Sequence, residues 1–231
     1  MNVLILGASG MVGQGVLREC LLDDGVQRVV TLGRSTLEQR HPKLQQIVHA
    51  DLFHLASVEE QLAGLDACFY CLGSSSAGMS EAEYTRVNHD LTLAVAQTLV
   101  RVEPDMTFLY VSGMGTDSSE HGRVMWARVK GRTENDLLKL PFVSAYMLRP
   151  AVIIPMYGIK SKTTLYRVLY ALMTPAYPLL ARLFPKHVTT SERLGRAMLR
   201  LARTGYPSRV LESRELDELG ARPGPAVQGQ S

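Results

Sequence analysis

The sequence predicts an α/β fold: a doubly wound, mostly parallel sheet with helices on both faces and a small C-terminal helical region. The first observation behind this prediction is that short β-branched runs alternate with helix-like stretches through residues 1–155. The second is that several of these runs are apolar almost throughout, as expected for parallel strands covered on both faces. The third is a hydrophobic content of 46%, which suffices for a large core and excludes a wholly disordered chain.

The apolar runs are expected to be strands joined by right-handed crossovers. They are Asn2–Leu6, Gln27–Leu32, Gln45–Ala50, Ala67–Leu72, Thr107–Ser112 and Val143–Leu148. After the first run, the apolar residues Val12, Val16, Cys20 and Leu21 recur with helical period, and Gly25 follows as a stop signal. This spacing predicts the first crossover helix.

Further helix starts are predicted from capping-box spacing, in which two side chains three positions apart satisfy free N–H groups at the helix end. The pairs are Ser57 with Glu60, Ser80 with Glu83, and Thr189 with Glu192. The helix after Thr189 is expected to end at Gly205 and carries a stripe of arginines. The stripe consists of Arg193, Arg196, Arg200 and Arg203. We interpret it as a solvated face, with an anionic partner site as the alternative.

The length of 231 residues favours a single domain. We assign it to residues 1–222, with residues 155–205 facing a substrate or partner and residues 223–231 forming a disordered tail. Residues 163–184 are rich in Leu, Tyr and Ala but contain Pro175 and Pro178. They predict a pair of core-covering helices broken at the prolines. The alternative is an apolar surface for a lipid-like substrate, a peripheral membrane contact or a homodimer partner.

The amino-acid composition argues against several classes of protein. A net charge of +3 is too small to indicate nucleic-acid binding. No apolar run approaches about 18 residues, so no transmembrane segment is expected, and the first residues lack the basic region of a signal peptide. Three cysteines do not make a disulfide framework, so we expect a cytoplasmic protein. Cys68 and Cys71 are spaced C-x-x-C but stand on opposite faces of a strand, so no metal site is expected.

The strongest functional motif is the glycine loop after the first strand, Gly7-Ala8-Ser9-Gly10-Met11-Val12-Gly13. Gly7 permits the tight turn out of the strand, Gly10 lets the backbone approach a pyrophosphate, and Gly13 lets the helix pack closely on the sheet. Free N–H groups at the positive end of the following helix then bind phosphate oxygens. This position in an alternating α/β chain predicts a Rossmann dinucleotide site.

Residues at the ends of the second and third predicted strands indicate which dinucleotide is bound. Arg34 stands where an NAD site has a carboxylate for the ribose 2′-hydroxyl, and its guanidinium suits a 2′-phosphate. NADP(H) is therefore expected in preference to NAD(H). Asp51, followed by Leu52, is expected to accept a hydrogen bond from the adenine amino group, with a turn cap as the alternative.

The fourth strand ends in Cys71-Leu72-Gly73, where the carboxyl edge of the sheet forms the ligand crevice. The loop that follows, residues 74–78, either borders the substrate or connects elements.

Together these features resemble the short-chain dehydrogenase/reductase superfamily, and in particular its atypical Tat-interacting oxidoreductase-like group. The resemblance covers residues 1–155 well and the remainder loosely. Besides the glycine loop it rests on Arg34, Asp51-Leu52, Asn88, Val111-Ser112, Lys130 and Arg149-Pro150-Ala151-Val152. It implies that Ser112 orients a substrate carbonyl, that Lys130 holds the nicotinamide ribose, and that Pro150 lies beside the nicotinamide.

The chain departs from the superfamily at the proton donor. The superfamily pairs its lysine with a tyrosine four positions earlier, but Trp126 stands there, and an indole does not act as a proton-transfer acid near neutral pH. Three replacements remain open: His121 in the preceding loop, Tyr157 after the Arg149-Pro150 strand end, or water acting on an easily reduced acceptor such as a quinone or flavin.

The resulting functional prediction is an NADP(H)-dependent oxidoreductase with a small-molecule substrate and non-standard proton delivery. The alternative is a catalytically inactive dinucleotide-binding sensor or scaffold. An epimerase or dehydratase of nucleotide sugars is a third hypothesis, which fits less well because that chemistry also depends on the missing phenol.

Overall fold

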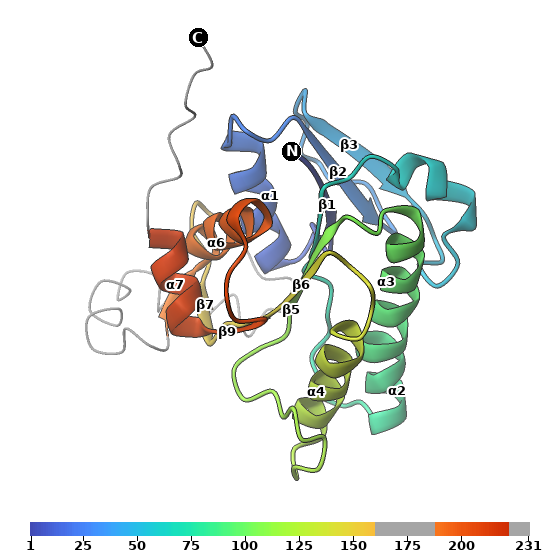
Figure 1. The fold of residues 1–231 in the computed structure, drawn as a ribbon, viewed down its shortest axis with the longest axis vertical. Helices are drawn as coiled ribbons and strands as arrows, with labels where there is room; N and C mark the ends of the chain where they lie inside the picture. Colours follow the sequence, from blue (N-terminus) through green and yellow to red (C-terminus); the bar gives the residue numbers. More distant parts are fainter. Residues whose placement is uncertain (160–187, 222–231) are drawn as a thin grey trace.

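The computed structural model describes residues 1–159 and 188–221, and their centre is a parallel sheet of seven strands. Its order is β3-β2-β1-β4-β5-β6-β9, and every pairing is parallel (Figure 1). The strands are β1 (Asn2–Leu6), β2 (Arg28–Gly33), β3 (Leu44–Val48), β4 (Ala67–Tyr70), β5 (Thr107–Val111), β6 (Ser144–Arg149) and β9 (Val210–Glu212). The doubly wound α/β prediction is therefore confirmed. The short strand β9 at the edge was not predicted.

A second, two-stranded parallel sheet pairs β7 (Val152–Ile154) with β8 (Val188–Thr190). The helices of the described residues are α1 (Met11–Leu22), η1 (Ala56–Leu62), α2 (Glu81–Thr85), η2 (Arg86–Asp90), α3 (Leu91–Val102), α4 (Met125–Leu137), α6 (Ser191–Thr204) and α7 (Ser213–Ala221). Elements α2, η2 and α3 follow one another without a break, and η2 is a single π-helical segment between two α-helices.

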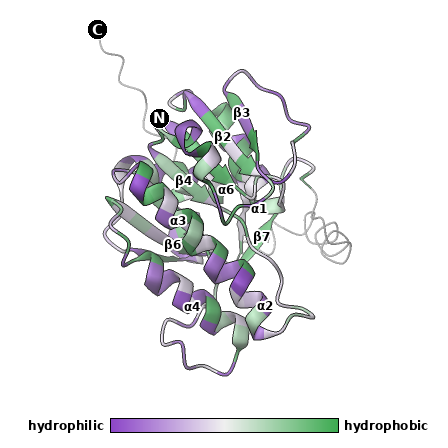
Figure 2. Cartoon of the chain, turned by 90° about the vertical axis from the view of Figure 1, so that its right-hand side faces the viewer, coloured by the Kyte–Doolittle hydropathy of each residue, from purple (hydrophilic) through white to green (hydrophobic). Residues whose placement is uncertain are grey.

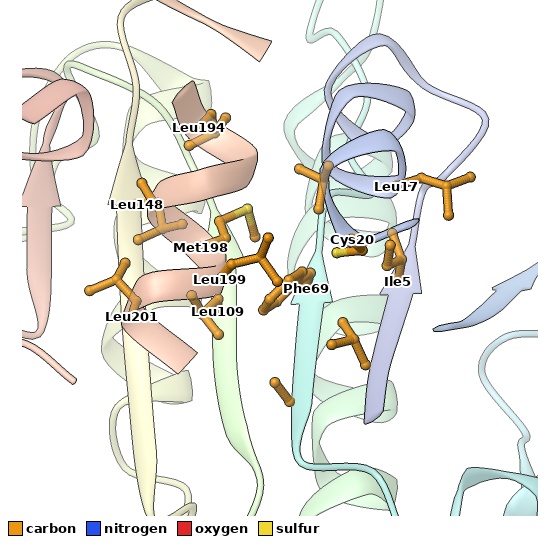
Figure 3. Close-up of a cluster of buried hydrophobic side chains, with 14 of the residues drawn as sticks. Ile5, Leu17, Cys20, Phe69, Leu109, Leu148, Leu194, Met198, Leu199 and Leu201 are labelled. Atoms are coloured by element: carbon orange, nitrogen blue, oxygen red, sulfur yellow. The ribbon is translucent and has the colours of Figure 1, made fainter. Parts of the chain in front are cut away.

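Two apolar cores sandwich the large sheet because side chains alternate between the faces of each strand. On one face α1, α6 and α7 pack against side chains such as Ile5, Phe69 and Leu148. Figure 3 shows this core, in which Leu194 and Met198 of α6 meet the sheet beside α1. On the other face η1, α3 and α4 cover a second set of strand side chains. Figure 2 shows the same partition, with hydrophobic strands inside and hydrophilic residues on the outer surfaces of α2 and α4.

The sheet reverses its direction of growth between β1 and β4, where ligands of such sheets bind. Strands β2 and β3 follow on one side of β1, whereas β4, β5, β6 and β9 lie on the other. The glycine loop leaves β1 at this point, and Cys71 to Gly73 leave β4 beside it. The predicted ligand crevice is therefore built from the ends of neighbouring strands.

The three predicted capping boxes have different outcomes. The Ser80 side chain accepts a hydrogen bond from the Glu83 backbone N–H, and Glu83 returns one, so this box is confirmed. The Ser57 box is wrong, because Ser57 lies inside the 3₁₀ segment η1, which starts after Leu55 and has no side-chain cap. The box at Thr189 is displaced by one residue, since Thr190 is the cap of α6 and accepts from Arg193 N.

The arginine stripe of α6 forms intramolecular ion pairs instead of a purely solvated face. Arg193 pairs with an acidic residue of α7, Arg196 with residues of α1 and α6 itself, and Arg203 with the end of α1. The partners are Asp217, Glu19 with Glu192, and Asp23. The period of the stripe was read correctly, but α1 and α7 come to lie beside α6 only in the folded chain. This arrangement does not favour the anionic partner.

Some expectations fall outside the described residues. The whole 163–184 segment and the predicted tail at 223–231 belong to residues 160–187 and 222–231, so the interpretations given for them remain predictions. Within residues 1–159 and 188–221, no helix has both the length and the apolar character needed to cross a bilayer.

Candidate functional site

The glycine loop is a tight turn that leaves no room for side chains at two positions. Gly7 has φ +80°, and a Cβ there would lie 2.7 Å from backbone atoms of Cys71 and Leu72. A Cβ at Gly13 would lie 2.2 Å from the Gly7 carbonyl oxygen. The turn is closed by a hydrogen bond of 2.8 Å from Gly10 N to Gly7 O. The first turn of α1 is thereby brought directly against the end of β1.

The amino end of α1 has the features of an anion site. Gly10 is its N-cap, no side chain caps the helix, and its first turn contains no acidic residue. The backbone N–H groups at Met11 and Val12 belong to the unpaired first turn that every α-helix has. Together with the helix dipole they suit a diphosphate, so the residues fit the phosphate bridge of a dinucleotide.

The residues expected at the adenosine end lie in different environments. Arg34, after β2, is exposed. Asp51, after β3, accepts hydrogen bonds from Phe53 N at 2.9 Å and from the His54 ring at 2.7 Å, and these bonds lower its pKa. Asp51 therefore forms the turn cap that was weighed as its alternative role. Leu52 is buried in the core below η1, so only its backbone is available to a ligand.

A pocket of about 490 Å³ opens at the carboxyl ends of β4, β5 and β6. Val12 of α1 reaches its wall, so the pocket adjoins the glycine loop. The other lining residues come from the three strand ends, the loops after them and α4: Cys71, Leu72, Gly73, Ser74, Val111, Ser112, Gly113, Met114, Lys130, Pro150, Ala151, Val152 and Ile153. Ser112, Lys130 and Pro150 thus meet in one pocket with the residues that end β4.

The Ser112 hydroxyl is held by a buried carboxylate. Its Oγ donates to Glu134 Oε1 at 2.5 Å and also lies 3.0 Å from the Leu148 carbonyl oxygen. Glu134 is 1% exposed and accepts two hydrogen bonds of 3.1 Å from Arg149 Nε, with a further bond from the same guanidinium. Arg149 is therefore committed to an ion pair that ties the end of β6 to α4.

Lys130 lies one helical turn before Glu134 on the same side of α4. Its Nζ donates to the Ser112 carbonyl oxygen and lies 5.9 Å from the centroid of the Tyr110 ring. Burial lowers the pKa of Lys130 to about 8, while the charge of Glu134 opposes that shift. The pocket therefore holds an ammonium group that is more acidic than that of an ordinary lysine.

A buried asparagine braces the loop after β4. Asn88 is 2% exposed and lies in the π-helical segment η2. Its side-chain amide donates to Ser74 Oγ at 3.0 Å and to Tyr84 O at 3.1 Å, and its Oδ1 accepts from Ser74 N at 3.2 Å. A Cβ at Gly73 would lie 3.5 Å from the same Oδ1. Single-turn π segments occur frequently at functional sites, and this one positions a wall of the pocket.

The two side chains considered as proton donors do not join Ser112 and Lys130. His121 is exposed in the loop before α4 and is not among the residues that line the pocket. Tyr157 lines a different cavity of about 810 Å³ between α1 and residues 35–41. Its hydroxyl donates to Glu192 at 2.9 Å, which raises its pKa, and its ring lies 3.5 Å from the Arg18 guanidinium carbon.

Trp126 does not line the pocket either. Its ring lies close to the loop after β5, where a Cβ at Gly115 would be 3.5 Å from Trp126 Cη2. The residue that sequence analysis did not select is Glu134. Its signal was the spacing of four from Lys130, which places both side chains on one face of a helix.

Residues 3–125 match the family described as the NAD dependent epimerase/dehydratase family. The chain belongs to this family. Among relatives, FMP52 of Eremothecium gossypii is 31% identical over 67% of both chains. HTATIP2 of Rattus norvegicus is 30% identical over 66% of this chain and 63% of that protein. The expected place among atypical, NAD(P)-binding short-chain dehydrogenase/reductases is thereby confirmed.

Solved structures agree with this epimerase/dehydratase-family fold. A UDP-glucose 4-epimerase of Thermotoga maritima superposes with a TM-score of 0.65 at 16% identity, covering 95% of this chain and 81% of the other. DesIV of Streptomyces venezuelae, a dTDP-glucose 4,6-dehydratase with NAD bound, gives a TM-score of 0.64 at 16% identity, covering 95% and 80%. At this identity the likeness concerns the fold.

The relatives correct one expectation. The FMP52 proteins of Eremothecium gossypii and Emericella nidulans are named mitochondrial, which contradicts the predicted cytoplasmic location and points to mitochondria. The prediction rested on the cysteines, and all three are free thiols. The number of cysteines and their free state do not identify a compartment.

Proposed function

We propose that the protein is an NADP(H)-dependent oxidoreductase that reduces a small, largely apolar carbonyl or quinone compound. The observation that carries the proposal is the pocket in which Ser112 and Lys130 adjoin the glycine loop through Val12. A dinucleotide whose diphosphate lies on the amino end of α1 has this pocket within reach along the carboxyl edge of the sheet. Dinucleotide binding follows from the family, whereas the preference for NADP(H) and the reaction are our proposals.

The cofactor residues proposed for the diphosphate are the loop residues Gly7, Ala8, Ser9 and Gly10, with Met11 and Val12. Arg34 would contact the 2′-phosphate because it is an exposed cation at the end of β2 and forms no recorded ion pair among residues 1–159 and 188–221. Asp51 and the Leu52 backbone would lie near the adenine, and Cys71, Leu72, Gly73 and Pro150 near the nicotinamide. Lys130 would hold the ribose.

The lining of the pocket favours an apolar substrate. Met114 and Val152 are exposed large side chains at its wall, 46% and 37% accessible. Exposed apolar side chains around a few polar groups are typical of small-molecule sites. A substrate carbonyl would lie toward Lys130, and its apolar body against Met114 and Val152. When bound, NADPH supplies the hydride, and the chain supplies orientation and the proton.

The first experiment measures cofactor binding by calorimetry. Arg34→Ala is expected to weaken NADPH binding by about 10- to 100-fold and to leave NADH binding unchanged, because one charge-assisted contact to the 2′-phosphate is lost. Arg101→Ala is the matched control, since Arg101 is an exposed arginine of α3 that pairs with Glu59. Equal losses for both coenzymes would refute the 2′-phosphate assignment, and no heat with either coenzyme would refute the proposed function.

The second experiment follows NADPH oxidation with phenanthrenequinone and nitrobenzaldehyde. Steady turnover of either compound supports the oxidoreductase. Tight NADPH binding without oxidation would favour a dinucleotide-binding sensor, the second candidate. That candidate is supported by Trp126 at the position of the missing phenol and by the commitment of the Ser112 hydroxyl to Glu134.

A further inference from the structure

The pocket offers a reacting oxygen very few protons. In the part of the chain that the structure describes, the lining side chains with polar hydrogens are Ser74, Ser112, Cys71 and Lys130. Ser74 Oγ is directed to the Met79 sulfur and accepts from Asn88. Burial raises the pKa of the Cys71 thiol to about 12, so it retains its proton. Two candidates remain, Ser112 and Lys130.

The Ser112 hydroxyl is oriented to accept a hydrogen bond from a ligand rather than to donate one. A hydroxyl has one hydrogen, and the short contact to Glu134 Oε1 together with the nearby Leu148 carbonyl oxygen engages it. Glu134 cannot turn away, because Arg149 binds both of its carboxylate oxygens. The Ser112 oxygen therefore presents lone pairs to the pocket, and the proton of a reduced carbonyl must come from another group.

We propose that the Lys130 ammonium is the catalytic acid that protonates the substrate oxygen, in place of the phenol that Trp126 replaces. This inference rests on the proposed function and deepens it. Among residues 1–159 and 188–221, Lys130 is the one cation that lines the pocket, and the Ser112 carbonyl oxygen is the one hydrogen-bond acceptor of its Nζ. The Ser112 carbonyl fixes the position of Nζ and leaves two N–H bonds for ligands.

The groups around Lys130 leave its proton available. Glu134 faces it from its own helix, but Arg149 already neutralises that carboxylate. Tyr110 of β5 presents its ring to Nζ, and Cys71 after β4 lines the same pocket as a neutral thiol. Among the described residues, Lys130 donates no hydrogen bond to a carboxylate, and burial lowers its pKa more than the charge of Glu134 raises it. An acid whose pKa lies near the working pH is the best proton donor.

The step balances in atoms and charge. The carbonyl carbon gains a hydride from reduced NADP and forms a C–H bond, while the carbonyl oxygen gains the proton as an N–H bond of Lys130 breaks and an O–H bond forms. Lys130 is left as a neutral amine and is protonated again from water through the open pocket. The substrate is reduced to an alcohol, and NADP is oxidised by two electrons.

The test compares Lys130→Arg with wild type on two acceptors. Arginine keeps the positive charge but does not release a proton near neutral pH. We expect kcat for nitrobenzaldehyde to fall by about 10²- to 10⁴-fold, the usual contribution of a general acid. The loss of kcat for phenanthrenequinone should be at least about tenfold smaller, because a quinone yields a stabilised oxyanion that needs little protonation, whereas a changed contact to the ribose would affect both acceptors equally. Lys139→Arg, on an exposed residue at the end of α4, is the matched control.

A second readout does not need turnover. The NMR titration of the lysine side chains, assigned with Lys130→Arg, should show Lys130 Nζ losing its proton near pH 8 with NADP⁺ absent and present. In wild type, aldehyde reduction should fall as pH rises through the same midpoint. An ordinary Lys130 midpoint, or equal losses on aldehyde and quinone in Lys130→Arg, would overturn the inference. If wild type nevertheless binds NADPH and reduces the quinone, the proposed function remains and only the role of Lys130 as the acid is refuted.

Discussion

Two corners of the carboxyl edge are built in different ways. The glycine corner, residues 7–13 at the junction of β1 and α1, is shaped by backbone alone: a positive φ at Gly7 and a contact that excludes any side chain at Gly13. The lysine corner consists of Ser112, Lys130, Glu134 and Arg149, and side-chain hydrogen bonds and charges hold it together. The first corner fits a charged diphosphate, and the second surrounds the proposed reacting atoms.

The difference determines how each corner responds to mutation. A backbone-built site fails when atoms are added, because there is no space for them. A site built on buried charges fails when one partner is removed, because the remaining charge is left without compensation. The lysine corner is therefore expected to be the more sensitive in stability, and the glycine corner the more sensitive in cofactor binding.

The largest expected effect is at Glu134. Replacing it with leucine removes the 1% exposed partner of Arg149 and leaves, among the described residues, the exposed Glu212 at 3.3 Å as its ionic partner. We expect the free energy of unfolding to fall by about 3–5 kcal/mol, measured by urea denaturation. Glu218→Gln, which breaks the exposed pair with Arg214, should change it by less than about 1 kcal/mol. Similar losses in both variants would show that the Glu134–Arg149 pair is not a buried structural unit.

The next effect concerns the pH dependence of stability. Burial lowers the pKa of Lys130 to about 8 in the folded protein, from about 10.4 in an unfolded chain. Between these values the unfolded state binds more protons, so the free energy of unfolding should rise with pH. The rise should reach up to about 3 kcal/mol and should be missing in Lys130→Met.

Unfolding curves between pH 7 and about 10.5 test this prediction as the difference between wild type and Lys130→Met. The difference is needed because buried tyrosines act with the opposite sign: burial raises the pKa of Tyr110 far above its ordinary value, so the unfolded state loses that proton first. A difference that does not change with pH would show that Lys130 titrates normally.

At the glycine corner, Gly13→Ala places a Cβ 2.2 Å from the Gly7 carbonyl oxygen. Displacing backbone in this way should cost about 1–3 kcal/mol of stability and should abolish the heat of NADPH binding. Gly78→Ala is the control, because no atom of residues 1–159 and 188–221 lies within 4 Å of a Cβ built at Gly78, although its φ of +77° is strained for alanine. Its cost should be about 1 kcal/mol of backbone strain with NADPH binding retained. Unimpaired binding in Gly13→Ala would contradict the backbone origin of this corner.

The smallest expected effect concerns α2 and its N-terminal cap. Ser80 caps α2, which leads directly into the π segment that carries Asn88. Ser80→Ala should lower the free energy of unfolding by about 1 kcal/mol, whereas Ser57→Ala should leave it unchanged because Ser57 caps nothing. Thermal unfolding of the two variants measures both effects. Equal losses would mean that the capping box at Ser80 makes no contribution of its own.

The sequence predicted the sheet well because its signals are local. Apolar runs and glycines identify strands and turns without knowledge of their neighbours, so β1 has its predicted limits and the other five predicted strands lie within a few residues of theirs. The same spacing rule failed at Ser57 and was off by one at Thr189. A capping box requires a helix that begins at the serine or threonine, and the packing of the surrounding chain decides where the helix begins.

The residues of the candidate site also fall into those that local motifs predict and those that only tertiary contacts place. The glycine loop, Ser112 and Lys130 follow from motifs and do meet at one edge. The positions of His121 and Tyr157 could not be predicted, because each lies in a loop whose direction depends on distant partners, Glu192 and Arg18 in the case of Tyr157. The sequence did not predict a role for Glu134 in the site, because a glutamate on a helix is usually exposed.

By itself the sequence determined the alternation of strands and helices, the glycine turn and the absence of a phenol four residues before Lys130, since each depends only on the order of neighbouring residues. The tertiary structure alone decided which proton donor of the pocket is available to a substrate. Packing β5, α4 and β6 together directs the Ser112 hydroxyl to Glu134, binds Arg149 to the same carboxylate and directs Lys130 Nζ to the Ser112 carbonyl oxygen. These are contacts between residues far apart in the chain, and their energies depend on burial that no local pattern specifies.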